Sequence, residues 1–101
     1  MDLDGKHVIV TGASRGVGRA ISLACAAEGA TVYLLARNKD ALQEVEKAIK
    51  DQGGQAYPYS VDLTDHNQVE KTVSSVVDQC QSIDALINNA GVGHWSDIVE
   101  T

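Results

Sequence analysis

The sequence is poor in cysteine, proline, phenylalanine and positive charge. Its two cysteines, Cys25 and Cys80, have no metal-ligand spacing, so we expect neither a disulfide framework nor a cysteine metal site. Eight basic residues against 14 acidic ones give a formal net charge of −6, which disfavours nucleic acid and anionic membranes as partners. No apolar run reaches the roughly 20 residues that span a bilayer, and no signal peptide is evident. These absences predict a cytoplasmic protein without a metal.

Short apolar runs alternate with amphipathic stretches along the 101 residues, which suit one small domain. The apolar runs predict strands, and helical spacing predicts the segments between them. The expected strands are about 6–11, 31–36, 55–61 and 85–88, and the expected helices are about 15–28, 39–52 and 65–81. A β-α-β-α-β-α-β order with short connections indicates a parallel sheet.

Right-handed crossovers fix how such strands are arranged. They carry the chain from the first strand to the second and third, and the third helix then returns over the other face. The predicted strand order is therefore 3-2-1-4 in a doubly wound α/β fold, and Pro58 favours an edge position for the third strand. A ligand is expected above the carboxyl ends of strands one and four, where the order reverses.

Side chains at the helix ends and on the first helix allow finer predictions. Asn38 is the expected N-cap of the second helix, and Thr64 or Asp65 that of the third. Gly29 is placed to end the first helix in a left-handed conformation. The expected buried face of the first helix consists of the apolar residues at helical spacing, which are Val17, Ala20, Ile21, Ala24 and Cys25.

A glycine-rich turn, Thr11–Gly18, joins the first strand to the first helix. Gly12 permits the tight turn, Gly16 lets a phosphate approach the backbone, and Gly18 lets the helix lie close to the sheet. The N–H groups at the helix start and the positive end of the helix dipole favour an anion. The alternative is a loop that binds nothing, because glycines also occur in such loops.

The end of the second strand discriminates between dinucleotides. An NAD site usually offers a carboxylate about 20 residues past the glycines, whereas this chain has Ala36 followed by Arg37. Arg15 in the glycine turn is close enough to reach the same region. Two guanidinium groups suit a 2′-phosphate, which favours NADP(H) over NAD(H). The alternative is that Arg37 only covers the surface.

Two further groups follow strands three and four. Asp62 is positioned to accept a hydrogen bond from an adenine amino group, with the Leu63 amide beside it, although aspartate is also common in turns. Asn88–Gly91 places a side-chain amide and small residues where a cofactor ribose would pass close to the backbone. The alternative for that stretch is an ordinary turn at the end of a strand.

The chain resembles the short-chain dehydrogenase/reductase family, and within it most closely the 3-oxoacyl-carrier-protein reductases. The resemblance is carried by Thr11–Gly18, Asp62–Leu63 and Asn88–Gly91. The resemblance implies a Rossmann-type doubly wound parallel sheet and hydride transfer between nicotinamide and a carbonyl or alcohol carbon. The implied contacts are to pyrophosphate and 2′-phosphate from Gly12, Ser14, Arg15, Gly16, Val17, Gly18, Arg37 and Asn38, to adenine from Asp62 and Leu63, and to the ribose and nicotinamide side from Asn89, Ala90 and Gly91.

The chain lacks the catalytic residues that the family uses for proton transfer. The family uses a tyrosine with a lysine four residues later and a serine, and none of Tyr33, Tyr57 and Tyr59 has such a lysine. We therefore expect residues 1–101 to be the NADP(H)-binding half of a longer, oligomeric enzyme for small carbonyl or alcohol substrates, and to be inactive alone. The alternatives are a non-catalytic nucleotide-binding module and, less favoured, an S-adenosylmethionine site. The latter would require an acidic residue after the second strand, where this chain has Ala36 and Arg37.

Overall fold

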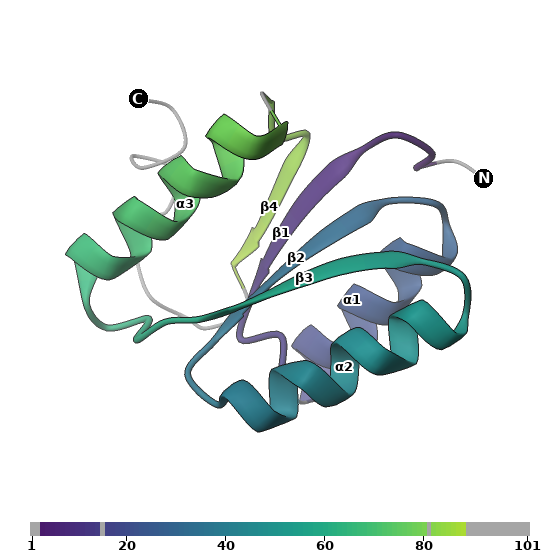
Figure 1. Ribbon diagram of the computed structural model, residues 1–101, viewed down its shortest axis with the longest axis horizontal. Coiled ribbons are helices and arrows are strands. Elements are labelled where there is room, and N and C mark those ends of the chain that lie inside the picture. Colours follow the sequence, from purple (N-terminus) through teal and green to yellow (C-terminus); the bar gives the residue numbers. More distant parts are fainter. Residues whose placement is uncertain (1–2, 15, 81, 89–101) are drawn as a thin grey trace.

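A four-stranded parallel sheet forms the centre of the computed structural model, which describes residues 3–14, 16–80 and 82–88 (Figure 1). The strand order is β3-β2-β1-β4, with neighbouring strands parallel. This confirms the predicted fold class and strand order, including the edge position of the strand that holds Pro58. The elements are β1 (His7–Thr11), α1 (Gly16–Ala27), β2 (Thr31–Ala36), α2 (Lys39–Asp51), β3 (Gln55–Ser60), α3 (His66–Cys80) and β4 (Ala85–Asn88).

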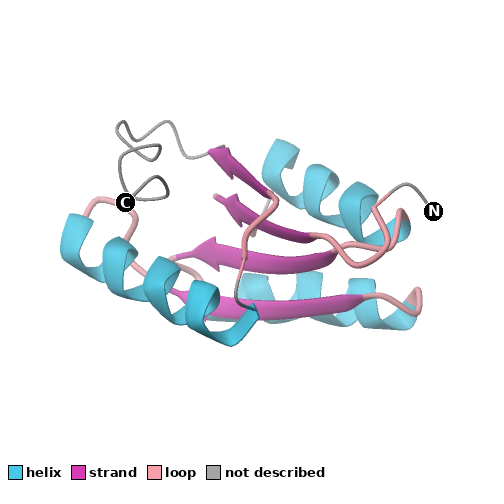
Figure 2. Cartoon of the chain, turned by 90° about the horizontal axis from the view of Figure 1, so that it is seen from above, coloured by secondary structure: helices cyan, strands magenta, loops and turns pink. Residues whose placement is uncertain are grey.

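Helices cover both faces of the sheet. In Figure 2, α3 lies in front of the sheet and α1 and α2 lie behind it, while the four strands all point the same way. Because successive strand residues face opposite sides, each strand contributes to two hydrophobic cores. The first core joins Val8, Val10, Val32 and Leu34 to Leu42, Val45 and Ile49 of α2. The second joins Ile9, Tyr33 and Leu35 to Val69, Val73 and Val76 of α3.

The two cysteines pack against different cores. Cys25 lies against the core on the α1 and α2 side, and Cys80 lies against the core on the α3 side. Both are free thiols, and burial raises the pKa of the Cys25 thiol. The expectation that they form no disulfide with each other is confirmed, because the sheet separates them.

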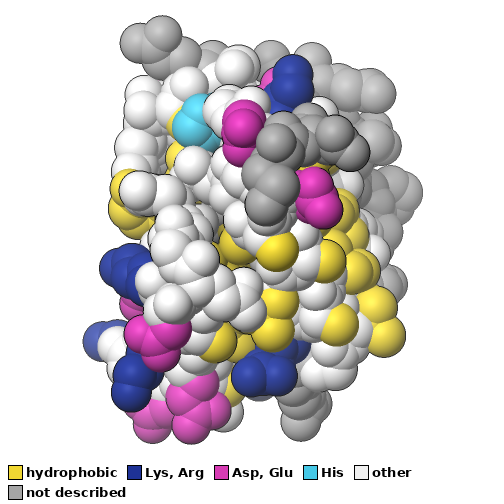
Figure 3. All heavy atoms as spheres, turned by 90° about the vertical axis from the view of Figure 1, so that its right-hand side faces the viewer, with side chains coloured by type: hydrophobic (Ala, Val, Ile, Leu, Met, Phe, Trp, Pro, Cys, Tyr) yellow, Lys and Arg dark blue, Asp and Glu magenta, His cyan; other side chains and the backbone are white. Residues whose placement is uncertain are grey.

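The predicted buried face of α1 is right at Ile21 and Cys25, which pack against the core, and wrong at the other three positions. The residues that α1 buries are Gly18, Ser22 and Ala26, at spacings of four, whereas Val17 is 63% exposed. Small residues let the helix lie close to the sheet, and Ser22 is tolerated there because its Oγ donates to the Gly18 carbonyl at 2.8 Å. Ala20 and Ala24 are exposed as well. Exposed hydrophobic side chains are a general feature of this surface, as Figure 3 shows for one face of the molecule.

Gly29 ends the last turn of α1 with φ +100°, which confirms its predicted left-handed conformation. A Cβ at this position would collide with the Asp4 side chain and lie 3.1 Å from the Asp4 Cα. Gly53 follows α2 with a comparable φ of +86° but has open space around it. The two glycines therefore separate the cost of backbone conformation from the cost of a clash.

We expect Gly29→Ala to destabilise the fold more than Gly53→Ala does. The left-handed conformation costs a residue with a Cβ roughly 1–2 kcal/mol, and only Gly29→Ala adds a clash with Asp4. Urea unfolding followed by circular dichroism measures both losses. Equal losses for the two variants would contradict this packing of the turn.

Candidate dinucleotide-binding site

The glycine turn leaves β1 with two residues in the left-handed region, Gly12 at φ +64° and Gly16 at φ +60°. A Cβ built on Gly16 meets no atom within 4 Å, so the backbone at the start of α1 borders open space. The amide of Ala13 donates to the Leu35 carbonyl at 3.3 Å, which ties the turn to the end of β2. The first N–H groups of a helix have no partner within it, and the dipole makes this end positive. The turn therefore has the backbone geometry of an anion site.

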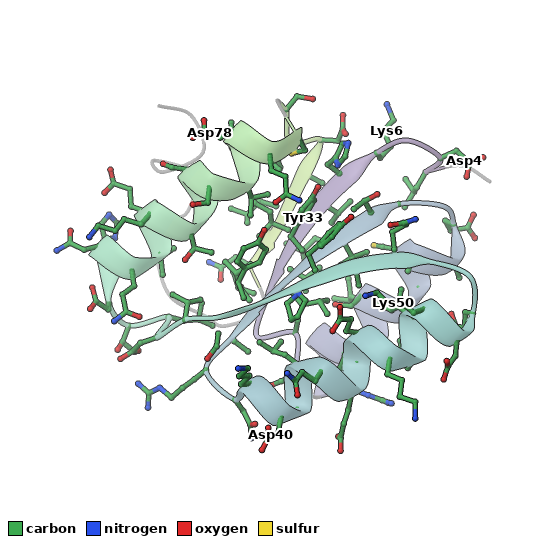
Figure 4. All side chains as sticks on the ribbon, in the orientation of Figure 1. Asp4, Lys6, Tyr33, Asp40, Lys50 and Asp78 are labelled. Atoms are coloured by element: carbon green, nitrogen blue, oxygen red, sulfur yellow. The ribbon has the colours of Figure 1, made fainter. Side chains whose placement is uncertain are left out.

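A cleft of about 540 Å³ opens between this turn and the start of α2. Asp40, labelled in Figure 4, marks the first turn of α2. The structure thus brings the glycine turn together with the residues that follow β2, as the parallel order of the strands requires. The cleft is lined by Gly12, Ser14, Arg37, Asn38 and Ala41.

Asn38 is the N-cap of α2, as predicted. Its backbone is extended, with φ −82° and ψ 100°, and its Oδ1 accepts a hydrogen bond from the Ala41 amide at 3.0 Å. Because this oxygen serves the cap, the group that the Asn38 side chain can offer a phosphate is its Nδ2 donor. The start of α2 adds the positive end of a second helix dipole to the cleft.

Arg37 and Asp62 contact each other at the carboxyl ends of β2 and β3. The Arg37 Nη2 lies 2.8 Å from the Asp62 Oδ1, and the Arg37 side chain is 74% exposed. The Ser60 hydroxyl donates to the Arg37 carbonyl at 2.9 Å, which holds the backbone of Arg37 against β3. The sequence placed both residues toward a ligand but did not predict that they pair.

Thr64 holds the Asp62 carboxylate in place. Its hydroxyl and its amide donate to Asp62 Oδ1 at 2.6 and 2.9 Å. These two hydrogen bonds, with that from Arg37, lower the pKa of Asp62 to about 2, so the carboxyl group stays ionised above that pH. Sequence reasoning missed this role of Thr64, although an Asp-x-Thr pattern is a known signal for such a turn.

Asp65 and Leu63 follow β3 and lie near the start of α3. Asp65, and not Thr64, caps α3 by accepting from the amides of Asn67 and Gln68. The Leu63 side chain packs against the core under α3.

Between β1 and β4, where the strand order reverses, Thr11 pairs in register with Asn88 of β4. The Thr11 Oγ1 donates to Asn88 Oδ1 at 3.1 Å. Arg15, Asn89, Ala90 and Gly91 lie outside the described residues.

The described ranges 3–14, 16–80 and 82–88 hold neither a metal-binding cluster nor a membrane-spanning helix. Within them, no group of three or more histidine, cysteine, aspartate or glutamate side chains is arranged to hold a metal ion. Nor does any helix of these ranges have the length and apolar character needed to cross a membrane.

Known proteins are similar to this chain in sequence. Residues 6–101 match the family described as short chain dehydrogenase. A fatty acyl-CoA reductase of Acinetobacter baylyi is 43% identical over 90 residues, which are 89% of this chain and 30% of that protein. A 3-oxoacyl-[acyl-carrier-protein] reductase of Thermotoga maritima is 39% identical over 92 residues, which are 91% of this chain and 37% of that protein. The chain thus spans about a third of the length of these relatives.

Solved structures agree. A metagenomic short-chain oxidoreductase in complex with NADP has a TM-score of 0.88 at 39% identity, over 92% of this chain and 42% of that chain. An NAD+-bound xylitol dehydrogenase has a TM-score of 0.85 at 39% identity, over 91% of this chain and 35% of that chain. With the glycine turn and the strand order, these matches confirm the resemblance, and the chain belongs to the short chain dehydrogenase family.

Proposed function

We propose that this chain is the NADP(H)-binding part of an oxidoreductase that transfers a hydride between NADP(H) and a carbonyl or alcohol carbon. The observation that carries the proposal is the cleft, which joins the glycine turn to Arg37 with no carboxylate directly after β2. The similarity to short-chain oxidoreductases bound to NADP and to NAD+ supports a nicotinamide dinucleotide here, and Arg37 is the ground for choosing NADP(H). When bound, the nicotinamide supplies the carbon that donates or accepts the hydride.

Different residues of the chain bind different parts of the cofactor. In this proposal the amides at Gly16, Val17 and Gly18 receive the pyrophosphate, because the open space outside Gly16 admits an oxyanion to the backbone. The 2′-phosphate lies between the Arg37 guanidinium and the start of α2.

The remaining contacts follow the order of the strands. Ser14, Arg15 and Nδ2 of Asn38 add donors to the phosphates, Asp62 and the Leu63 amide receive the adenine, and Asn89, Ala90 and Gly91 lie beside the ribose and nicotinamide.

Tyr33 and Tyr59 are unsuited to proton transfer at the cleft. Tyr33, labelled in Figure 4, is only 2% exposed and stacks on Tyr57 with ring centroids 5.6 Å apart. Burial, with a smaller contribution from Cys80, raises the pKa of Tyr33, and burial also raises the pKa of Tyr59. A tyrosine that passes a proton near neutral pH needs a lowered pKa instead. We therefore propose that the 101-residue chain binds cofactor without turning over a substrate.

Titration of the chain with NADPH and with NADH tests this function. We expect NADPH to bind about tenfold more tightly, because a charge-assisted hydrogen bond contributes on the order of 1.5–3 kcal/mol and tenfold in affinity corresponds to about 1.4 kcal/mol. Calorimetry or the fluorescence of the reduced nicotinamide measures both dissociation constants. Equal constants would contradict the preference, and ketone-dependent oxidation of NADPH by this chain would contradict its inactivity.

A further inference from the structure

The guanidinium of Arg37 is held by a carboxylate that is itself fixed. Asp62 Oδ1 lies 2.8 Å from Arg37 Nη2 and accepts from the hydroxyl and the amide of Thr64. The hydrogen bond from Ser60 to the Arg37 carbonyl fixes the backbone from which the guanidinium extends. Both partners of the ion pair are therefore anchored to the segment that leaves β3, beside the cleft that Arg37 lines.

From this arrangement we infer that Asp62 determines cofactor specificity by limiting how strongly Arg37 attracts a 2′-phosphate. The inference rests on the proposed function, since it concerns the same nucleotide site. In this role Asp62 is a positioning residue that acts through Arg37, in addition to the adenine contact proposed for it above. Its effect is selective, because only a cofactor that carries a 2′-phosphate needs the charge of Arg37.

Donor geometry gives the first reason. A guanidinium grips an oxyanion bidentately through an edge that pairs Nη2 with either Nη1 or Nε. Nη2 belongs to both edges, and it is the nitrogen that contacts Asp62. Each edge uses a different hydrogen of Nη2, so the carboxylate occupies one edge, and a 2′-phosphate must bind through the other edge or displace the carboxylate. Displacement is opposed by Thr64, whose two hydrogen bonds keep Asp62 in place.

Coulomb's law gives the second reason. A phosphate roughly 4 Å from the guanidinium would lie roughly 6.5 Å from a carboxylate on the other side of it, and the energy of each interaction falls as the inverse of the distance. The repulsion from Asp62 then cancels roughly 60% of the attraction to Arg37. Asp62 carries this negative charge at neutral pH, and its lowered pKa of about 2 extends the charged range further into acid.

The test replaces Asp62 by asparagine, whose side-chain oxygen still accepts from Thr64 while the negative charge is gone. The readout is the ratio of the NADH to the NADPH dissociation constant, because any change in the adenine contact affects both cofactors and cancels. We expect Asp62→Asn to raise this ratio roughly three- to tenfold at low ionic strength, where exposed charges are least screened. Asp78→Asn removes the same charge from α3, away from the cleft (Figure 4), and should leave the ratio unchanged.

A third variant separates failure of this inference from failure of the proposed function. Arg37→Gln should lower the ratio, because it removes the guanidinium from the 2′-phosphate. If Arg37→Gln leaves the ratio unchanged, the phosphate contact of Arg37 is wrong, and the role of Asp62 is wrong with it. If Arg37→Gln lowers the ratio while Asp62→Asn leaves it unchanged or lowers it, only the inference about Asp62 is overturned. Thermal melting by circular dichroism confirms that each variant is folded before its ratio is read.

Discussion

Gly16→Ala is expected to weaken NADPH binding about a hundredfold. The methyl group would fill the open space outside the start of α1, through which the pyrophosphate reaches the backbone amides in the proposed function. Losing charge-assisted hydrogen bonds, each worth about 1.5–3 kcal/mol, accounts for an effect of this size, since about 1.4 kcal/mol is tenfold in affinity. Calorimetric titration with NADPH measures the loss, and NADH should lose as much because both cofactors carry the pyrophosphate.

Gly53→Ala is the matched control for this variant. Gly53 also has a positive φ, +86°, and open space around it, but it lies in the turn between α2 and β3, before the amino end of β3, whereas Gly16 follows the carboxyl end of β1. Both variants carry the same backbone strain of roughly 1–2 kcal/mol, so they should melt at similar temperatures while only Gly16→Ala loses the cofactor. Normal NADPH affinity in Gly16→Ala would show that no phosphate approaches the backbone there.

Arg37→Asp is expected to reverse the cofactor preference, with the ratio of NADPH to NADH affinity falling about a hundredfold. The substitution removes charge-assisted hydrogen bonds to the 2′-phosphate and puts a like charge in their place. It also places a carboxylate at the end of β2, where an NAD site offers one to the ribose hydroxyls. Parallel titrations with both reduced cofactors measure the ratio.

Lys47→Asp controls for the change in net charge. Lys47 is exposed on α2 and does not line the cleft, so its substitution changes the formal charge by the same amount without touching the nucleotide. We expect the ratio of affinities to stay within about twofold of the unmodified chain, because an exposed side chain that does not line the cleft makes no hydrogen bond to the 2′-phosphate, and salt at about 0.1 M weakens the remaining interaction between exposed charges. A ratio that shifts equally in both variants would mean that net charge, and not contact with Arg37, sets the preference.

Local patterns in the sequence are enough to predict the architecture of this chain. Apolar runs mark the strands, and the handedness of crossovers leaves few ways to order them, so the order 3-2-1-4 follows before any contact is known. Pro58 and Asn38 are equally local signals, since each acts through its own backbone or its nearest neighbours. The edge of the sheet that holds the cleft also follows, because the carboxyl ends of parallel strands meet there. The predicted pair of strands differs, since the cleft is lined by residues that follow β1 and β2, whereas the sequence predicted a ligand above β1 and β4.

Packing and side-chain pairing are not local in this sense. The hydrophobic periodicity of α1 favours Val17 as a buried residue, yet the close approach of the helix to the sheet selects Gly18 and Ser22 instead. Ser22 can be buried because its hydroxyl donates a hydrogen bond to the Gly18 carbonyl. The contact between Arg37 and Asp62 joins residues 25 positions apart that follow different strands, and only the sheet shows that they meet.

A structure of the chain with NADPH bound tests the central claim most directly. The account predicts the pyrophosphate against the backbone at the start of α1, beside Gly16, and the 2′-phosphate on the guanidinium of Arg37. A nucleotide bound away from the carboxyl ends of the strands, or an Arg37 side chain turned away from the 2′-phosphate, would contradict it.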